Sequence, residues 1–367
     1  MTQQTPDGWR LFRGDRVARE VEFPEAPPWR QFGDRPGGRP RHRPYLIGRT
    51  EADVVSAALH LRRPLLVTGH PGTGKSSLAH AIAHELSLGP VLQWPVNSRS
   101  VLKDALYGYD AIGRLRETHL RQERGDPEPD IGTYVRLGPL GTALVPRDRP
   151  RLLLVDELDK GDVDLPNDLL TVFEEGEFEI PELSRLPETQ SEVPVLTHGS
   201  GGERVTVTRG VVRCREFPVV VITSNGERDF PPAFMRRCVR LDLPDPDEAR
   251  LRDIVAAHLG EDALSDVDDL LHAFLNRRAP GELATDQLLN AVFLRKGGVD
   301  LDAEGLLDAV LHRLGGMVSA CAGATGRREE PRVTPVAGPA ARTSRCPADP
   351  APVEQTRPAG RSRAVDP

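Results

Sequence analysis

Cysteine is scarce in this sequence, with four among 367 residues: Cys214, Cys238, Cys321 and Cys346. No two of them form a Cys-x-x-Cys pair, which argues against a zinc knuckle and against a dithiol redox site. Sparse cysteine is typical of proteins in a reducing cytosol, so we predict a cytoplasmic location. The first residues, MTQQTPDGWR, lack the apolar run of a secretory signal, and we expect none.

Long apolar runs are also missing. No stretch approaches the roughly 18 apolar residues that a membrane span requires, and the mean hydropathy is −0.40. We therefore expect no membrane partner. Lys and Arg total 48 against 55 Asp and Glu, for a net charge of −7. A mildly acidic chain is a poor candidate for a general nucleic-acid coat, although a local basic groove stays possible.

Aromatic residues make up only 5% of the chain, whereas proline is abundant, with 34 residues. Residues 1–44 are rich in Pro, Arg and Gly, and we read them as an extended leader, either disordered or pinned to the next domain by aromatic residues such as Trp29. Residues 321–367 have few large apolar side chains, so burial cannot offset the entropy of ordering them. We predict that this tail is disordered.

The segment between these ends has the pattern of an α/β domain followed by helices. Apolar runs at 65–68, 151–155 and 217–223 alternate with helical patterns. Such runs indicate parallel strands that helices cover on both faces. We therefore predict a three-layer αβα core over 45–243. Four amphipathic patterns after Pro244 predict a small helical lid over 244–320.

A phosphate-binding loop follows the first of these strands. The segment GHPGTGKS matches G-x-x-x-x-G-K-[ST], with a strand before it and a helix after it. Glycines let successive N–H groups face a phosphate, and Lys75 supplies a charge for the terminal phosphates. The side chain of Ser76 supplies an oxygen for Mg²⁺. The predicted nucleotide-binding residues are Gly69, His70, Pro71, Gly72, Thr73, Gly74, Lys75, Ser76 and Ser77.

Two carboxylates end the second apolar run, in the sequence LLLVDE. Ligands bind at the carboxyl ends of strands in open α/β sheets. We predict that Asp156 holds Mg²⁺ together with Ser76, and that Glu157 polarises an attacking water. An Asp followed by a Glu favours hydrolysis over transfer to a second metabolite.

The segments GHPGTGKSS, LLLVDELDK, VVITSNGERDF and PAFMRRC together resemble an AAA+ ATPase, and most closely the MoxR-like branch of the dynein-related type. The resemblance covers about residues 45–320 and implies a P-loop NTPase core with a helical lid. It also implies ATP as the nucleotide and a homo-oligomeric ring, expected to be a hexamer. A further implication is chaperone-like remodelling of a protein client, often with a von Willebrand A-type partner.

The resemblance assigns further roles residue by residue. Asn225 would be the sensor 1 residue, which contacts the γ-phosphate or the water held by Glu157. Arg237, or its neighbour Arg236, would be the arginine finger that reaches the nucleotide of the next subunit. The family usually has a basic sensor 2 residue at the start of the third lid helix. This chain has Glu282 near that place, so Arg277 or Arg278 serves from a shifted position, or sensor 2 is absent.

The family also implies inserts at 100–138 and 177–216. Tyr107, Tyr109 and Tyr134 in or near the first insert either line a central pore or pack against their surroundings. The cluster Asp159, Asp162 and Asp164 lacks the spacing of a calcium loop, and we interpret it as a solvated helix start.

Three functions remain open from the sequence. The first is a Mg²⁺-dependent ATPase ring. The second is a nucleotide-controlled binding switch that turns over slowly, which the doubtful sensor 2 keeps open. The third is a nucleic-acid motor like the McrB-type ATPases, which would need a DNA-recognition domain that we do not find in the sequence.

Overall fold

The computed structural model describes residues 9–12, 14–31, 45–199, 201–265, 267–277, 283–301 and 305–312. The predicted tail over 321–367, together with Arg278 and Glu282, lies outside the described residues. Much of the predicted leader does too, and its described part includes the short 3-10 helix η1 (Pro28–Arg30).

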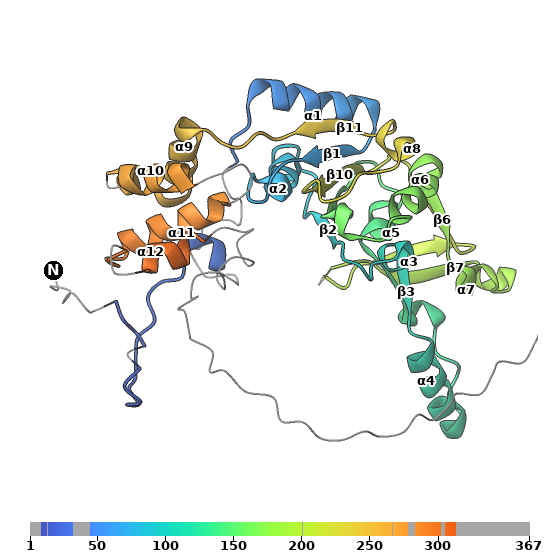
Figure 1. Ribbon diagram of the computed structural model, residues 1–367. Coiled ribbons are helices and arrows are strands. Elements are labelled where there is room, and N and C mark those ends of the chain that lie inside the picture. Colours follow the sequence, from blue (N-terminus) through green and yellow to red (C-terminus); the bar gives the residue numbers. More distant parts are fainter. Residues whose placement is uncertain are drawn as a thin grey trace, which may run out of the picture. The chain divides into compact units, whose positions relative to one another are not determined.

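A five-stranded parallel sheet forms the first part of the core, in the order β11-β1-β10-β5-β2. Figure 1 labels β11, β1, β10 and β2 of this sheet. In the central register, Leu65 pairs with Val221 on one side and with Val239 on the other. The carboxyl ends of β1, β5 and β10 therefore lie side by side at one edge of the sheet. The strands are β1 (Leu65–Thr68), β2 (Leu92–Pro95), β5 (Leu152–Asp156), β10 (Val219–Ser224) and β11 (Val239–Asp242).

Helices cover both faces of this sheet because its central strands β1, β5 and β10 are apolar on both sides. Leu65 and Val67 face one buried cluster, which includes side chains of α1 (Arg49–Leu61) and α2 (Lys75–Glu85). Leu66 faces the other cluster, with side chains of helices α5, α6 and α8. The predicted three-layer αβα architecture is confirmed. The three helices are α5 (Pro139–Ala143), α6 (Leu165–Glu175) and α8 (Pro232–Met235).

The two predicted inserts together form a second, six-stranded sheet in the order β3-β4-β7-β8-β9-β6. Its neighbours pair antiparallel, except β4 with β7, which are parallel. That parallel pair joins residues 100–138 to residues 177–216. The strands are β3 (Tyr107–Tyr109), β4 (Val135–Leu137), β6 (Glu177–Glu179), β7 (Glu192–Leu196), β8 (Arg204–Thr208) and β9 (Val211–Arg213).

Short helices accompany this second sheet. The buried ring of Tyr107 stacks on Phe178 with 6.4 Å between centroids, and its hydroxyl donates to Glu182 Oε2 at 2.8 Å. Tyr107 is therefore a packing residue in this chain. The helices are α3 (Leu102–Leu106), α4 (Ala111–Arg124), η2 (Ile131–Tyr134), α7 (Pro181–Ser184) and η4 (Glu188–Gln190).

The lid has its own buried core, in which Leu251, Phe274 and Leu288 meet. Trp29 packs on this core, where its Nε1 donates to Asn290 Oδ1 at 3.1 Å and its ring lies edge-on to Phe293 at 5.8 Å. The helices are α9 (Glu248–Leu259), η5 (Glu261–Leu264), α10 (Asp268–Arg277), α11 (Thr285–Lys296) and α12 (Leu306–Val310). In the described part of the chain, no helix is both long and apolar enough to cross a bilayer.

Candidate functional site

The phosphate loop joins β1 to α2, and its backbone shape explains its glycines. Gly69, Gly72 and Gly74 have backbone φ values of 147°, 80° and 91°. Residues other than glycine rarely adopt such values. Space is limited as well. A Cβ on Gly69 would lie 2.7 Å from the carbonyl oxygen of Leu243. The loop therefore holds its curled shape only with glycine at these positions.

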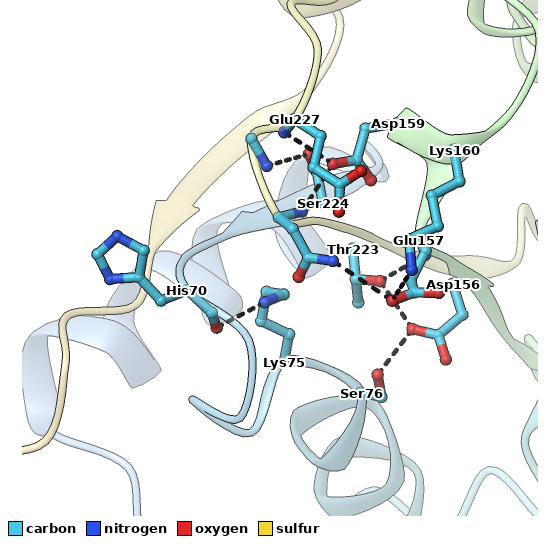
Figure 2. A network of polar contacts seen from close by, with 12 residues as sticks. His70, Lys75, Ser76, Asp156, Glu157, Asp159, Lys160, Thr223, Ser224 and Glu227 are labelled. Atoms are coloured by element: carbon cyan, nitrogen blue, oxygen red, sulfur yellow. Dashed lines mark hydrogen bonds and ion pairs between the residues drawn. The ribbon is translucent and has the colours of Figure 1, made fainter. Parts of the chain in front are cut away.

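Lys75 is the first residue of α2, and it is only 7% exposed. Its Nζ donates to the carbonyl oxygens of Gly69 and His70, each at 2.8 Å. Burial lowers the pKa of Lys75, and the nearby carboxylates of Asp159 and Glu157 oppose that shift. The ammonium group is thus held inside the loop, next to the acidic end of the sheet (Figure 2).

A chain of hydroxyl and carboxylate groups links the loop to the ends of β5 and β10. Ser76 Oγ donates to Asp156 Oδ1 at 2.7 Å, and Thr223 Oγ1 donates to the same oxygen at 2.7 Å. The second carboxylate oxygen of Asp156 accepts from Gln93 Nε2 at 3.2 Å. Figure 2 shows Ser76, Asp156 and Thr223 as one network. The roles of Thr223 and Gln93 in this network were not predicted from the sequence.

Glu157 follows Asp156 and has a left-handed backbone, with φ 61°. Its backbone N–H donates to Thr223 Oγ1 at 2.8 Å, so one hydroxyl holds both acidic residues. Two side chains meet Glu157 Oε1: Asn225 Nδ2 donates at 3.3 Å, and Lys160 Nζ lies at 2.9 Å. The hydrogen bond to Glu157 raises the pKa of Lys160. Glu157 and Asn225, predicted to act together, are therefore in contact.

The interpretation of Asp159 as a solvated residue is wrong. Asp159 is 3% exposed, and its Oδ2 accepts the backbone N–H groups of Asn225 at 2.9 Å and Glu227 at 3.1 Å. Its Oδ1 is buried and accepts no hydrogen bond from the described residues. The carboxylate thus fixes the backbone that presents Asn225. The sequence places Asp159 two residues after Glu157, close to the predicted site. This spacing does not reveal which backbone N–H groups donate to its carboxylate.

The two candidate finger residues differ in their surroundings. The side chain of Arg237 forms an ion pair with Glu174 of α6, and its Nη1 donates to the carbonyl oxygen of Ala233 at 3.1 Å. Arg236 is exposed. Among the described residues, neither arginine forms a hydrogen bond or ion pair with the phosphate loop.

The lid touches the phosphate loop at the start of α11. A Cβ on Gly72 would lie 2.5 Å from the Cβ of Ala284 and 2.9 Å from the nitrogen of Thr285. Arg277, one candidate for sensor 2, pairs instead with Asp308 inside the lid, with 2.7 Å between Nη1 and Oδ1. In the described part of the lid, Ala284 and Thr285 therefore lie against the loop, whereas Arg277 pairs elsewhere.

A cavity of about 720 Å³ opens beside the phosphate loop. Its walls come from the segment before α1, the loop itself and the lid, and include Tyr45, Gly74, Ser77, Asp245, Arg250 and Asp286. Burial, with a smaller contribution from Glu51, raises the pKa of Tyr45 to about 12. His70 Nδ1 lies 3.1 Å from Asp245 Oδ2, which ties the loop to the segment leading into the lid. The volume is in the range of small-molecule and cofactor sites.

Residues 64–238 match the family model for an AAA domain of the dynein-related subfamily. The match begins just before β1 and ends just after α8, so it includes the phosphate loop, the acidic pair, Asn225 and both finger candidates.

Solved structures of NtrX from Brucella abortus are similar to this chain. The complex with ATP has 18% identity and a TM-score of 0.39, over 74% of this chain and 57% of the NtrX chain. The complex with ADP has 18% identity and a TM-score of 0.38, over 73% of this chain and 55% of the NtrX chain. This chain thus spans little more than half of NtrX. No curated protein matches the sequence.

Proposed function

The chain contains an AAA domain of the dynein-related subfamily, and on that premise we propose that it binds ATP with Mg²⁺ and hydrolyses the γ-phosphate. The observation that carries this proposal is the polar network of Figure 2. It joins the phosphate loop to the ends of two neighbouring strands, where it brings a lysine, a hydroxyl, two carboxylates and an amide together. Phosphoryl transfer needs mainly such positioning and electrostatic stabilisation.

The residues around Asp156 suit magnesium. Ser76 Oγ and Asp156 Oδ1 lie 2.7 Å apart and are hard oxygen donors of the kind that Mg²⁺ prefers. Among the described residues, no group of three or more His, Cys, Asp or Glu side chains could hold a metal alone. Ser76 and Asp156 would therefore bind the ion together with nucleotide phosphates. When bound, the ion neutralises charge on those phosphates.

Glu157 is the proposed general base. Its carboxylate oxygen would accept a proton from the attacking water, which the amide of Asn225 helps to orient. Lys160 competes for the same oxygen at 2.9 Å. Turnover would then require Glu157 to share that oxygen between Lys160 and the water. Lys75, which donates to loop carbonyls, would turn its ammonium group to the β- and γ-phosphates.

The cavity of about 720 Å³ is the proposed site of the base and sugar. It continues from Gly74 and Ser77 toward Tyr45 and Arg250, so a nucleotide with its phosphates on the loop would extend into it. The side chain of Arg250 donates to the carbonyl oxygen of Leu46 and lies 3.9 Å from Glu51. These contacts hold the wall of the cavity that precedes α1.

We also propose that the active form is a homo-oligomeric ring, expected to be a hexamer of the MoxR-like type, with an arginine supplied in trans. Exposed Arg236 and half-buried Arg237 directly follow α8, and among the described residues neither forms a hydrogen bond or ion pair with the phosphate loop. The ring would couple hydrolysis to remodelling of a protein client, and a von Willebrand A-type protein is the partner to test first. We further propose that it acts in the cytoplasm.

The experiment that tests this proposal is phosphate release by the purified full chain, measured over a range of protein concentrations with Mg²⁺ and ATP. We expect specific activity to rise with concentration, because a single subunit lacks the trans arginine. Tight ATP binding with no turnover at any concentration would instead support the slow binding switch. The pairing of Arg277 with Asp308 favours that second candidate, since it engages one of the two sensor 2 candidates inside the lid.

A further inference from the structure

Three arginines surround a second hollow, at the opposite end of β5 from the acidic pair. Arg147, Arg149 and Arg151 lie in the segment between α5 and β5, and they line a surface hollow of about 380 Å³ together with Ser87 and Leu88. Residue 151 precedes the first residue of β5, whereas Asp156 is its last residue. At about 3.3 Å per residue, the hollow and the nucleotide site are about 16 Å apart along the strand.

The positive charge in this hollow is only partly balanced. Arg149 Nη2 donates to the carbonyl oxygen of Leu86 and Arg151 Nη2 to that of Pro90, each at 2.9 Å. Carbonyl oxygens carry no formal charge to offset these two guanidinium groups. Arg147 pairs with Glu203 at 2.7 Å. Asp148 also lines the hollow, but Arg215 pairs with it at 2.7 Å. Four arginines therefore face two carboxylates, in a chain whose net charge is −7.

Two donors in this group have no protein acceptor. The Nε atoms of Arg147 and Arg151 are buried, and neither donates a hydrogen bond to any described residue. Buried donors without an acceptor are uncommon and point to an ordered water or an anion. Burial and the neighbouring charge of Arg147 also lower the pKa of Arg151. An anion between the two guanidinium groups would relieve both the missing hydrogen bonds and the repulsion.

We propose that this hollow binds the phosphate group of a small phosphorylated compound, at a site separate from the proposed nucleotide site. The planar guanidinium groups match the oxygens of a phosphate and bind it through paired hydrogen bonds. The side chains of Arg147 and Arg151 would have to turn for their buried Nε–H groups to reach such a ligand. The hollow, at about 380 Å³, has room for more than a single phosphate, so pyrophosphate and a nucleotide are the probes of the proposal.

The test uses isothermal titration calorimetry of the full chain with sodium pyrophosphate and, separately, with ADP, at low ionic strength. The Lys75→Ala variant serves as background, so that binding at the phosphate loop is weakened. We expect pyrophosphate to bind this background, and Arg151→Gln to weaken that binding roughly tenfold or more. Arg204→Gln is the matched control. Like Arg151, Arg204 donates to a backbone carbonyl oxygen, in this case that of Pro194 at 3.3 Å. Arg204 does not line the hollow.

A second variant keeps the test decisive if Arg151→Gln folds poorly. Glu203→Gln frees Arg147 from its carboxylate, so we expect pyrophosphate to bind several-fold more tightly. Tighter binding of ADP than of pyrophosphate, with the same response to both variants, would identify a nucleotide as the ligand. The proposal fails if pyrophosphate and ADP do not bind the Lys75→Ala background at millimolar concentration. It also fails if neither Arg151→Gln nor Glu203→Gln changes the affinity for pyrophosphate or ADP. Neither result depends on whether the chain hydrolyses ATP.

Discussion

The two sheets of this protein are built in opposite ways. The five-stranded sheet is parallel, and its three central strands are apolar on both faces, so helices cover it on both sides. The six-stranded sheet is mostly antiparallel and comes from two segments that are separated by β5 and α6. In strand β8, for example, Val207 is buried while its neighbours Thr206 and Thr208 are exposed.

This difference in topology determines which sheet brings the polar residues of the candidate site together. In a parallel sheet the carboxyl ends of all strands meet at one edge, which is where Lys75, Asp156, Glu157 and Asn225 gather. In the antiparallel sheet neighbouring strands end at opposite edges. A part-buried hydrogen bond from Tyr107 to Glu182 joins strand β3 to helix α7 beside this sheet. We expect changes in the first sheet to alter nucleotide chemistry, and changes in the second to alter stability or partner binding.

The largest expected effect comes from Lys75→Ala. Losing the buried ammonium group should weaken ATP binding by roughly 100-fold or more, because the phosphate loop GHPGTGKS contains no second lysine. Fluorescence titration with a labelled ATP analogue measures this. Lys103→Ala is the matched control, since Lys103 lies 5.6 Å above the ring of Tyr107 in the second sheet. Equal losses of ATP affinity in Lys75→Ala and Lys103→Ala would contradict the proposed difference between the two sheets.

The next effect concerns Asp159, which holds the backbone of Asn225. Asp159→Ala should lower kcat by roughly 10- to 100-fold, because a small misplacement of a positioning group is costly. ATP affinity should fall less than kcat, since among the described residues no hydrogen bond or ion pair joins Asp159 to the phosphate loop, although its charge acts on the pKa of Lys75. Asp159→Asn, which keeps an acceptor oxygen, should recover part of the loss.

The exposed Asp162 provides the control for Asp159, and Asp162→Ala should turn over normally. Steady-state kinetics together with binding data separate the two parameters. A loss of affinity that parallels the loss of kcat would mean that Asp159 supports the fold of the site and does not position Asn225.

A mixing experiment tests the shared site. Arg237→Ala should keep ATP binding and lose most hydrolysis, and Lys75→Ala subunits should be inactive through lost binding. Mixed subunits should regain part of the activity, because a Lys75→Ala subunit supplies an intact arginine to the neighbour's nucleotide. Arg236→Ala run in parallel decides between the two arginines. A mixture that stays inactive, although both variants assemble, would refute the trans arginine.

The smallest effect is expected in the second sheet. Tyr107→Phe removes the hydrogen bond to Glu182 and should lower the free energy of unfolding by about 1–2 kcal/mol. Chemical denaturation monitored by circular dichroism measures this change. ATP turnover below the unfolding temperature should be unchanged. A fall in turnover without a fall in stability would show that the second sheet takes part in catalysis.

The sequence predicted the first sheet better than the second. Runs such as Leu152–Val155 show their burial directly, because every residue is apolar. The strands of the second sheet are mostly short, and β3 and β6 have three residues each. Their pairing depends on contacts between distant segments. Val and Thr alternate at 205–208, a pattern typical of a strand, but nothing in the sequence indicates that β4 pairs with β7.

The site was predictable where a motif fixes geometry. The phosphate loop and the acidic pair follow strands whose ends meet, so their proximity could be inferred. Thr223, Lys160 and Asp159 were missed because their roles depend on side-chain and amide positions that only the folded chain defines. Lid residues were predictable as helices, but the partner of Arg277 was not.

The most direct test of the central claim is a paired measurement on Glu157→Gln, of ATP affinity and of phosphate release. The change keeps the size of the side chain but removes the carboxylate that would accept a proton. The account predicts ATP affinity close to that of the unmodified chain and turnover reduced by roughly 100-fold or more. Turnover that persists in this variant, while ATP still binds, would contradict the assignment of Glu157 and the proposed hydrolysis at the end of β5.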